Sequence, residues 1–403
     1  MKVTILPSTA QGAVLAPPSK SVTHRALIGG ALSEKSWIHN VAFSQDIEAT
    51  LRCLQAMGAQ VTREDDAVII GGLNPFDIPA GTKLDCGESG STLRFLLPLC
   101  LLASQPITLC GSEQLMNRPL WVYENICRDQ GLAFERVGNA ITVCGPLRAG
   151  QYNVPGDVSS QFVTGMLFAL SLLDEGSTLS VTGVLESASY VNLTLMLQNA
   201  FGVAVDNTEN VYVIRGGQTY RACSYIVEGD YSHAAILDAF NLLGGDVKVL
   251  GLSGSGAQSD RVYPCFYKQL HSENHSFDLT DCPDLGPVMF ALSAALEGAK
   301  FTGTARLRFK ESDRVAAMAE ELAKFGISCT IAANEVIVHK GSLKRPNADL
   351  SSHNDHRIVM ALALLCSLTG GTISSAEAVA KSYPDYFSVL HSLGLEVYFE
   401  EDM

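Results

Sequence analysis

The sequence is poor in charged and aromatic residues and has no long apolar run. Charged residues make up 17% of its 403 residues and aromatic residues 7%, whereas hydrophobic residues reach 47%. The longest apolar runs, Phe95 to Ala103 and Ile358 to Cys366, fall well short of the roughly 18 residues that a membrane-spanning helix needs. We therefore expect a globular protein with two or three domains and sizeable cores.

Patterns for targeting and for metal binding are also missing. The amino-terminal stretch MKVTILPSTAQGAV is broken early by Pro7 and by polar residues, so we predict no signal peptide and a cytoplasmic location. The 11 cysteines include no CxxC pair and no Cys/His cluster at metal spacing. We expect reduced thiols that pack as small hydrophobic side chains.

The sequence has no excess of positive charge. Its 28 Lys and Arg residues face 42 Asp and Glu residues, which gives a formal net charge of −14 at pH 7. General nucleic-acid binders and membrane-surface proteins usually show a basic excess, so this balance argues against both classes. An anionic ligand would need a local basic site.

What the sequence does contain is a repeat of about seventy residues. Six Ala/Leu-rich runs of helical length can be laid over one another, with equivalent positions at Ala31, Cys100, Ala169, Ala239, Ala291 and Ala361. Successive positions are 69, 69, 70, 52 and 70 residues apart. We interpret the runs as six copies of one supersecondary unit. The stretch HSENHSFDLTDCPD is short of strands, and we expect the fifth copy to be truncated.

A helix-start signal precedes each run, and strand-like pieces lie between the runs. The signals are Ser19/Ser21, Ser89/Ser91, Ser159/Ser160, Ser232, Asp284 followed by Pro287, and Asn354/Asp355. The strand-like pieces are AVII, YVNL, VYVIR, VKVL and EVIVH. The unit is therefore mixed α/β, and six units divide into two lobes of three with a crossover near residues 220–227.

Cationic residues gather in short Gly/Ser/Asp/Pro-rich stretches near these helix starts. They are Lys20, Arg25, Arg94, Arg118, Lys310, Arg314, Arg357 and Lys381. Helix amino termini offer free N–H groups and a partial positive charge, while Arg and Lys bind carboxylate and phosphate in complementary ways. The joint pattern favours a ligand that carries both groups, although each residue taken singly is also explained as a solvated surface cation.

Three polar turns carry weaker signals. CGESGST resembles a phosphate-cradling turn but lacks the GK[ST] ending of a P-loop, so an ordinary tight turn stays open. SSQ at residues 159–161 offers two hydroxyls and an amide for ligand groups, and a plain N-cap explains it as well. GLSGSGAQ at residues 251–258 has the wrong glycine spacing for a dinucleotide loop, so we predict no nucleotide site there.

Taken in order, these stretches make the chain resemble the enolpyruvyl transferases, above all the members that act on shikimate 3-phosphate. The matching stretches are PPSKSVTHR, DCGESGSTLRFL, NRP, VPGDVSSQF, SASY, VEGD, CPDLGPV, LRFKESDR, NDHR and AKSYPDYF. They span nearly the whole chain, and KESDR together with NDHR is the most specific combination.

The resemblance implies an inside-out α/β barrel with two lobes, each built from three βαβαββ units. One lobe would be residues 17–226, on the side of shikimate 3-phosphate. The other would be residues 1–16 plus 227–403, with the phosphoenolpyruvate site and the catalytic carboxylates. The amino-terminal strand, residues 3–6, would belong to the second lobe.

The reaction that the resemblance implies joins the 5-hydroxyl of shikimate 3-phosphate to C2 of phosphoenolpyruvate. A tetrahedral intermediate then expels phosphate, as a step of chorismate and aromatic amino acid biosynthesis. The family uses no metal or organic cofactor, and its members bind glyphosate at the phosphoenolpyruvate position. We expect small-molecule substrates only, and a monomer.

The resemblance also assigns roles to individual residues. Those implied for phosphoenolpyruvate are Lys20, Gly90, Arg118, Gln161, Arg314, Arg357 and Lys381. Those implied for shikimate 3-phosphate are Lys20, Ser21, Arg25, Ser159, Ser160, Gln161, Ser187, Tyr190, Asp284 and Lys310. Asp284 would take the 5-hydroxyl proton and Glu311 would protonate the methylene carbon, with His356 and Lys20 as further proton partners. Asp313 would orient a neighbouring cation.

The chain departs from the family pattern at two side chains, and two other functions stay open. Glu88 and Arg306 stand where the family often has Asn. A relative that transfers enolpyruvyl to UDP-N-acetylglucosamine would carry a Cys in the loop before Arg118, where this chain reads GSEQLMN. A non-catalytic ligand-binding relative would lack Asp284 or Glu311, and both are present.

Overall fold

The computed structural model describes residues 1–253, 256–270 and 275–400. Its contacts divide the chain into two compact units. We call Pro18–Glu228 the central unit, and Met1–Pro17 with Gly229–Met403 the terminal unit. Residues 254–255 of the GLSGSGAQ turn, and residues 271–274 of the stretch that was expected to be truncated, lie outside the described residues.

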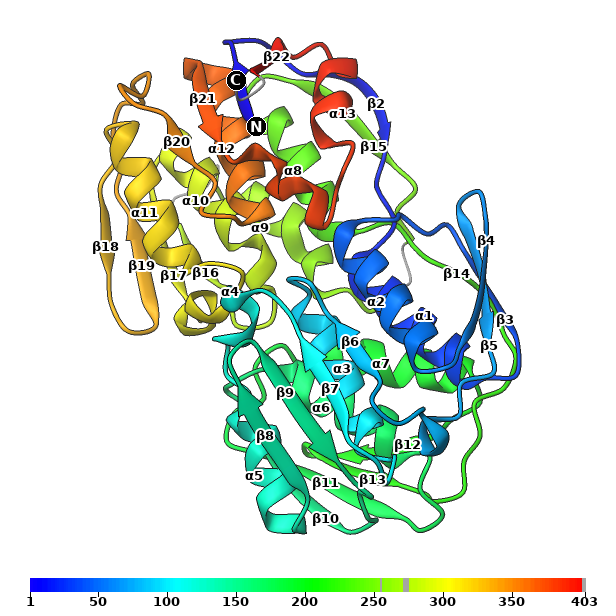
Figure 1. The fold of residues 1–403 in the computed structure, drawn as a ribbon. Coiled ribbons are helices and arrows are strands. Elements are labelled where there is room, and N and C mark those ends of the chain that lie inside the picture. The colour runs from blue at the N-terminus through cyan, green and yellow to red at the C-terminus, as the bar shows by residue number, and fades with distance from the viewer. Residues whose placement is uncertain (254–255, 271–274, 401–403) are drawn as a thin grey trace. The chain divides into compact units, whose positions relative to one another are not determined.

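The central unit contains three four-stranded sheets and the helices between their strands (Figure 1). Its helices are α1 (Lys20–Leu32), α2 (Gln45–Ala56), α3 (Gly90–Cys100), α4 (Glu113–Met116), α5 (Trp121–Gln130), α6 (Ser160–Leu170), α7 (Ala188–Ala200) and the 3₁₀ helix η1 (Pro75–Asp77). Its strands are β3 (Ser36–His39), β4 (Gln60–Glu64), β5 (Ala67–Gly71), β6 (Lys83–Asp85), β7 (Ile107–Cys110), β8 (Ala133–Val137), β9 (Ala140–Cys144), β10 (Gln151–Pro155), β11 (Ser177–Thr182), β12 (Val205–Thr208), β13 (Val211–Ile214) and β14 (Ser224–Ile226).

The three sheets share one topology, as a repeated unit requires. Their strand orders are β14-β3-β5-β4, β6-β7-β9-β8 and β10-β11-β13-β12. In each sheet the first two strands are parallel and the other pairings are antiparallel. A parallel pair needs a crossover, and α3 connects β6 to β7 and α6 connects β10 to β11, whereas α1 precedes β3 and its parallel partner β14 comes from the end of the unit. The predicted βαβαββ unit thus occurs three times here.

The helices form the interior of the central unit, while the sheets lie outside them (Figure 1). Helix α3 packs against α6, α6 against α7, and α7 against α1. Almost every residue of α3 and α6 is buried, which explains why their sequences are apolar on all sides rather than amphipathic. The Ala/Leu-rich runs that revealed the repeat are these interior helices.

The terminal unit repeats this arrangement with both ends of the chain. Its helices are α8 (Tyr231–Leu242), α9 (Tyr263–Gln269), α10 (Gly286–Ala295), α11 (Arg314–Lys324), α12 (His356–Thr369), α13 (Tyr386–Ser392) and the 3₁₀ helices η2 (Ser259–Val262), η3 (Pro283–Leu285), η4 (Ala305–Phe309) and η5 (Ala376–Lys381). Its strands are β1 (Lys2–Ile5), β2 (Gln11–Leu15), β15 (Asp246–Leu250), β16 (Ser276–Asp278), β17 (Ala299–Thr302), β18 (Cys329–Ile331), β19 (Glu335–Val338), β20 (Leu350–Ser351), β21 (Gly371–Ser374) and β22 (Val397–Glu400). Helices α8, α10 and α12 pack together in its core.

The shortened copy is the fourth, not the fifth. The fifth copy has a complete sheet, β16-β17-β19-β18, and the sixth has β20-β21-β1-β22. Strand β1 pairs with both β21 and β22, so the amino-terminal strand completes the sixth sheet. The fourth copy has only β15 and β2 among the described residues, because β16 follows shortly after α9. The short interval precedes the fifth helical run, and it is the fourth copy that has fewer strands in the part of the chain that the structure describes.

Local sequence signals were right for most helix starts, wrong for two of them, and wrong for one predicted strand. Ser89 caps α3 and Ser159 caps α6, as predicted. The start of α8 is capped by Asp230 rather than Ser232. Asp284 lies inside η3 and does not cap α10. The piece YVNL, predicted as a strand, is part of α7, whereas the other four strand-like pieces lie in β5, β13, β15 and β19.

The expectation about membrane spans agrees with the described part of the chain, where no helix combines the length and apolar character of a membrane crossing.

Candidate active site

The residues predicted for the site fall into two sets, one in each unit. In the central unit, Gly90 begins helix α3 beside two arginines and Gln161. A Cβ at Gly90 would lie 2.8 Å from Arg118 Nη1, 3.5 Å from Arg94 Nη1 and 3.7 Å from Gln161 Oε1. The Arg118 side chain forms no hydrogen bond or ion pair with the described residues, and its Nε is buried. The absence of a side chain at Gly90 therefore leaves room for the Arg118 guanidinium.

Arg94 holds Gln161 in this group. Arg94 Nη1 donates to Gln161 Oε1 at 2.7 Å, and Gln161 Nε2 donates to Ser91 Oγ at 3.0 Å. Pro98 in α3 has no N–H for the carbonyl of Arg94 four residues earlier, and Tyr123 donates its hydroxyl to that carbonyl at 2.6 Å instead. Both polar ends of Gln161 are thereby fixed between α3 and α6.

Lys20 and Arg25 lie on α1 with different partners. Lys20 Nζ forms an ion pair with Asp46 Oδ2 at 2.7 Å, which the sequence analysis did not anticipate. Arg25 is buried and donates Nε to Thr194 Oγ1 at 2.8 Å and Nη1 to the Ser21 carbonyl at 2.7 Å. Its Nη2 donates to the Tyr190 carbonyl at 3.1 Å.

No carboxylate among the described residues pairs with Arg25. Its guanidinium carbon instead lies 4.9 Å from the centre of the Phe95 ring and 6.0 Å from that of Tyr190. Burial lowers the pKa of Arg25 from its usual 12.5 to about 10. A buried cation that is compensated only by neutral dipoles is a favourable place for an anionic ligand.

The predicted serines lie at the starts of α6 and α7. Ser159 accepts a hydrogen bond from the Gln161 backbone N–H at 3.3 Å, and Ser160 is the first residue of α6. Ser187 stands at the N-cap position of α7 with a left-handed φ of 57°, and Tyr190 lies in the first turn of that helix. All three serines are buried.

In the terminal unit, the guanidinium of Arg314 joins three carboxylates. Arg314 Nε lies 2.8 Å from Asp355 Oδ2, Nη1 lies 2.8 Å from Asp284 Oδ1, and Nη2 lies 2.9 Å from Glu311 Oε2. The Arg314 side chain is 1% exposed, whereas those of Asp284 and Glu311 are 18% exposed. The two carboxylates predicted to move protons are thus held by one buried cation and remain accessible.

Asp284 is surrounded by cations. Its Oδ1 also lies 3.2 Å from Lys310 Nζ, and its Oδ2 lies 3.7 Å from Arg357 Nη2. Burial alone would raise the pKa of Asp284, but the charges of Lys310, Arg357 and Arg314 outweigh it and hold that pKa well below its usual range. Asp284 is therefore ionised at neutral pH in this state.

Arg357 is a buried cation with unused hydrogen-bonding capacity. It is the second residue of α12 and 3% exposed. Its Nε and Nη1 are buried and have no hydrogen-bond partner among the described residues. A buried guanidinium edge without partners is costly, so an anion that supplies oxygen atoms would stabilise it.

Asp313 was predicted to orient a neighbouring cation. In the structure it instead caps helix α11. Its Oδ1 accepts from the backbone N–H groups of Val315 at 3.1 Å and Ala316 at 3.0 Å. The cation-orienting carboxylate is Asp355, which was read only as a helix start. Asp355 Oδ1 accepts from the Arg357 backbone N–H at 2.9 Å and from Arg314 Nη2 at 3.3 Å, and its Oδ2 accepts from Arg314 Nε at 2.8 Å. Its place inside NDHR, beside two predicted site residues, was the available signal.

The remaining predicted residues of this unit lie close to the same turn. Lys381 ends η5, is buried, and donates Nζ to the Asn354 carbonyl at 2.5 Å. His356 begins α12 and is buried, with its Nδ1 3.9 Å from Asp355 Oδ1. The structure therefore brings Asp284, Lys310, Glu311, Arg314 and Arg357 into one contact network and places Lys381 and His356 at its NDHR side.

A second set of buried polar groups in the terminal unit was missed by the sequence analysis. Asp230 Oδ1 lies 3.1 Å from His233 Nδ1, and His233 Nε2 lies 3.1 Å from Ser382 Oγ, next to Lys381. Burial and the charge of Asp284 raise the pKa of Asp260 to about 7, although Ser232 donates a hydrogen bond to it. Asp230 and Ser382 lie in the stretches VEGD and AKSYPDYF, which the sequence analysis quoted without assigning a role to either residue, and Asp260 lies in η2, where no motif was found.

Glu88 and Arg306, which depart from the family pattern, are placed as follows. Glu88 is half-buried in the turn directly before the α3 cap Ser89. Arg306 lies in η4, is buried, and precedes the KESDR segment. Their effects on ligand binding stay predictions.

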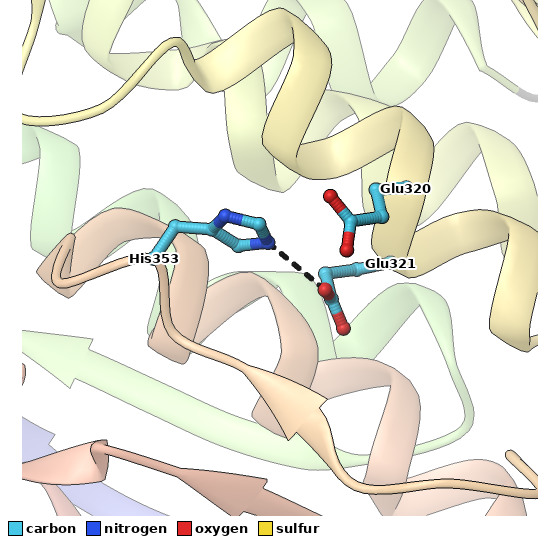
Figure 2. Close-up of side chains that lie close together, drawn as sticks. All are labelled: Glu320, Glu321 and His353. Carbon is cyan, nitrogen blue, oxygen red and sulfur yellow. Dashed lines mark hydrogen bonds and ion pairs between the residues drawn. The ribbon is translucent and has the colours of Figure 1, made fainter.

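One group of side chains has the composition of a metal site. Glu320, Glu321 and His353 bring their ligand atoms within 4.8 Å of one another (Figure 2). Lys324 Nζ, however, lies 2.9 Å from both oxygens of Glu321, and His353 Nε2 lies 2.9 Å from Glu321 Oε1. An ammonium already provides the positive charge here, so these residues do not fit a metal ion.

Comparison with known proteins identifies the family. The family model for EPSP synthase (3-phosphoshikimate 1-carboxyvinyltransferase) matches residues 6–264 and 258–390. The 3-phosphoshikimate 1-carboxyvinyltransferase of Clostridium kluyveri is 39% identical, over 98% of both chains, and that of Clostridium novyi is 36% identical, over 97% of both. A solved EPSP synthase from Acinetobacter baumannii has the same fold, with a TM-score of 0.80 at 22% identity over all of both chains. The chain belongs to the EPSP synthase family.

Proposed function

We propose that this chain transfers the enolpyruvyl group of phosphoenolpyruvate to the 5-hydroxyl of shikimate 3-phosphate and releases phosphate. The observation that carries the proposal is the Arg314 network, in which one buried guanidinium holds Asp284 at 2.8 Å and Glu311 at 2.9 Å. Addition to an enol needs an acid for carbon and a base for the hydroxyl, and two separate carboxylates on one support supply both. The family supports the choice of substrates.

The atoms balance in two steps. In the first, the 5-hydroxyl oxygen bonds to C2 of phosphoenolpyruvate, its proton passes to Asp284, and Glu311 donates a proton to the methylene carbon, which becomes a methyl group. In the second, the C2–O bond to phosphate breaks, and a methyl proton returns to Glu311 to restore the double bond. The proton on Asp284 leaves with phosphate or with water.

The charges around Asp284 explain how binding prepares the base. In this state burial would raise the pKa of Asp284, but the charges of Lys310, Arg357 and Arg314 outweigh burial and hold the pKa low. The low pKa makes the Asp284 carboxylate a weak base. Substrate phosphate and carboxylate groups that bind Arg357 and Lys310 would neutralise part of that field. The pKa of Asp284 would then rise toward the range in which a base works well. Substrate binding therefore strengthens the base that it needs.

The anion-binding roles follow from the unused donors. Arg357 and Arg118 have guanidinium groups with free capacity and are the first choices for phosphoenolpyruvate, with Lys381 and Lys20 nearby in their own units. Arg314 has five N–H groups and uses four on carboxylates, so its main contribution is to hold those carboxylates. Arg25, with the serines of α6 and α7, is assigned to shikimate 3-phosphate.

The test is phosphate release with both substrates, for the wild type and for Glu311→Gln. We expect the wild type to release phosphate and Glu311→Gln to lose about 10²–10⁴-fold in kcat with a much smaller change in KM, because the amide cannot donate a proton to carbon. The matched control is Glu320→Gln, an exposed glutamate on the same stretch of chain, which should behave as the wild type.

Two further assays separate the alternatives. Phosphate release with UDP-N-acetylglucosamine but not with shikimate 3-phosphate would assign the chain to the other transfer reaction. Binding of both shikimate pathway substrates without phosphate release in the wild type would indicate a non-catalytic relative. Either result would overturn the proposal.

A further inference from the structure

The turn at residues 351–357 carries several of the proposed binding groups. The Asn354 carbonyl accepts a hydrogen bond from Lys381 Nζ at 2.5 Å. Asp355 binds Arg314 Nε at 2.8 Å and caps Arg357 N at 2.9 Å. A shift of this turn would move Lys381, Arg314 and Arg357 together. Its conformation therefore affects the phosphoenolpyruvate side of the site.

The backbone of this turn is unfavourable by itself. His353 and Asn354 are consecutive residues with left-handed φ angles of 48° and 54°. Side chains other than glycine rarely adopt this region, and Asn tolerates it better than His does. Two such residues in sequence persist only where the surroundings hold them.

What holds the first half of the turn is Glu321 on helix α11. Its side chain is fully buried, accepts from the Ser351 backbone N–H at 3.0 Å, and lies 2.9 Å from His353 Nε2 (Figure 2). The second half is held by Arg314 through Asp355. Glu321 follows Arg314 by seven residues, about two helical turns, so both contacts come from one side of α11. The turn is fastened at two points to a single helix.

The bond to His353 differs from the others because a histidine, with an ordinary pKa of about 6.5, can change its charge within the physiological pH range. The groups that face His353 are Glu320, Glu321 and Lys324, all on α11, and Lys324 also donates to the Asp349 carbonyl at 3.2 Å. The hydrogen bond to Glu321 raises the pKa of His353 above its usual value, burial opposes this, and the charges of Glu321 and Glu320 add to the increase.

We propose that the Glu321–His353 pair is a positioning element that fixes the 351–357 turn for phosphoenolpyruvate binding, and that it is strongest when His353 is protonated. The inference rests on the proposed function, since it assigns a pH-dependent support to that site. Neither residue touches substrate in this account. They act through Lys381, Arg314 and Arg357.

The sign of the pH effect follows from the direction of the shift. A histidine whose pKa is raised in the folded protein contributes its full stabilisation below its unfolded value, about 6.5. The contribution is lost as the pH rises through the raised value. KM for phosphoenolpyruvate should therefore increase above that pH. Phosphate groups of the substrates also titrate near pH 6, so the comparison must be made between variants under identical conditions.

The experiment compares the wild type, His353→Gln and His353→Asn by phosphate release between pH 5.5 and 9. Gln reaches Glu321 and does not titrate, whereas Asn suits the left-handed backbone but is too short. For His353→Asn we expect a KM for phosphoenolpyruvate about 10-fold above that of the wild type at low pH, with kcat changed about twofold or less. His353→Gln should keep the low KM for phosphoenolpyruvate, and that KM should no longer increase with pH through loss of the His353 charge. His339→Gln, at an exposed histidine bonded to Thr330, is the matched control.

A second measurement does not depend on activity. The imidazole signal of His353, followed by NMR against pH, should titrate above the usual range in the wild type and shift down further in Glu321→Gln, which loses the hydrogen bond, than in Glu320→Gln, which loses only a neighbouring charge. An active wild type with an unchanged KM and pH profile in His353→Asn would overturn this inference alone. A wild type that releases no phosphate would overturn the proposed function and, with it, this inference.

Discussion

Arg25 and Arg314 are both buried, at 2% and 1% exposure, but their surroundings are opposite. Arg25 in the central unit donates to a threonine hydroxyl and two backbone carbonyls, and burial lowers its pKa to about 10. Arg314 in the terminal unit meets three carboxylates. Burial would lower its pKa too, but Asp355, Glu311 and Asp284 raise it well above the usual value.

The difference indicates a division of labour between the two arginines. A buried cation without a counter-charge gains most from an external anion, so Arg25 is suited to bind substrate. A cation whose charge is already balanced gains little from a further anion and instead fixes the carboxylates around it. Arg25 has no carboxylate partner within the described residues, and Arg118 and Arg357 have donors without a partner there, so all three suit an anionic ligand. Arg314 instead supports the acid–base groups.

The strongest test of this comparison is Arg314→Met. Removing the cation leaves three carboxylates close together in a buried place, and breaking such a network costs about 3–5 kcal/mol in free energy of unfolding. Phosphate release should also fall about 10³-fold or more, because Asp284 and Glu311 lose their common support. Urea unfolding and initial rates measure the two effects.

The control for Arg314→Met is Arg215→Met, which breaks an exposed ion pair with Asp206 at 3.1 Å. Exposed pairs contribute little, so neither stability nor rate should change measurably. If Arg314→Met unfolds at the same urea concentration as the wild type, the carboxylates do not depend on Arg314, and the comparison fails.

Arg25→Gln should give the reverse balance, with a small loss of stability and a large loss of binding. The hydrogen-bond partners that Arg25 would lose are neutral, so the expected loss in free energy of unfolding is about 1–2 kcal/mol. KM for shikimate 3-phosphate should increase about 10-fold to 100-fold because a charge-assisted contact to an anion is lost. The KM for phosphoenolpyruvate should change far less.

Arg52→Gln is the matched control, since Arg52 is an exposed arginine on α2 of the same unit. It should leave both KM values unchanged. A drop in stability for Arg25→Gln as large as that for Arg314→Met, without a change in KM, would show that Arg25 is structural and that the proposed division of labour is wrong.

The repeat and most of its helices could be predicted from the sequence because they depend on local periodicity. Interior helices are apolar on all sides, and their spacing shows directly in the Ala/Leu-rich runs. Which copy is shortened could not be read from spacing, since a short interval between two helices does not say on which side strands are missing. YVNL was misjudged because its β-branched and aromatic residues favour strands, while tertiary packing places it in α7.

The charged residues of the site could be listed from the sequence, but their pairing could not. Arg314 binds Asp355 across 41 positions of sequence, and this contact exists only because α11 and α12 pack together. Asp313 is nearer to Arg314 in sequence and was given the orienting role. Its position at the N-cap, where backbone N–H groups are free, directs its carboxylate to Val315 and Ala316 instead.

The smallest expected effect comes from Gly90→Ala, which is also the sharpest test of the proposal that guanidinium groups with unused donors bind substrate. The new Cβ would lie 2.8 Å from Arg118 Nη1, the far end of a flexible side chain, so Arg118 moves and the fold is little affected. KM for phosphoenolpyruvate should increase about fivefold, equivalent to about 1 kcal/mol, and inhibition by glyphosate, expected at the same position, should weaken. Gly150→Ala, where a Cβ meets open space, is the control. Unchanged values for both ligands would remove Arg118 from the phosphoenolpyruvate site and leave Arg357, whose Nε and Nη1 have no partner among the described residues, as the main guanidinium that could bind this substrate.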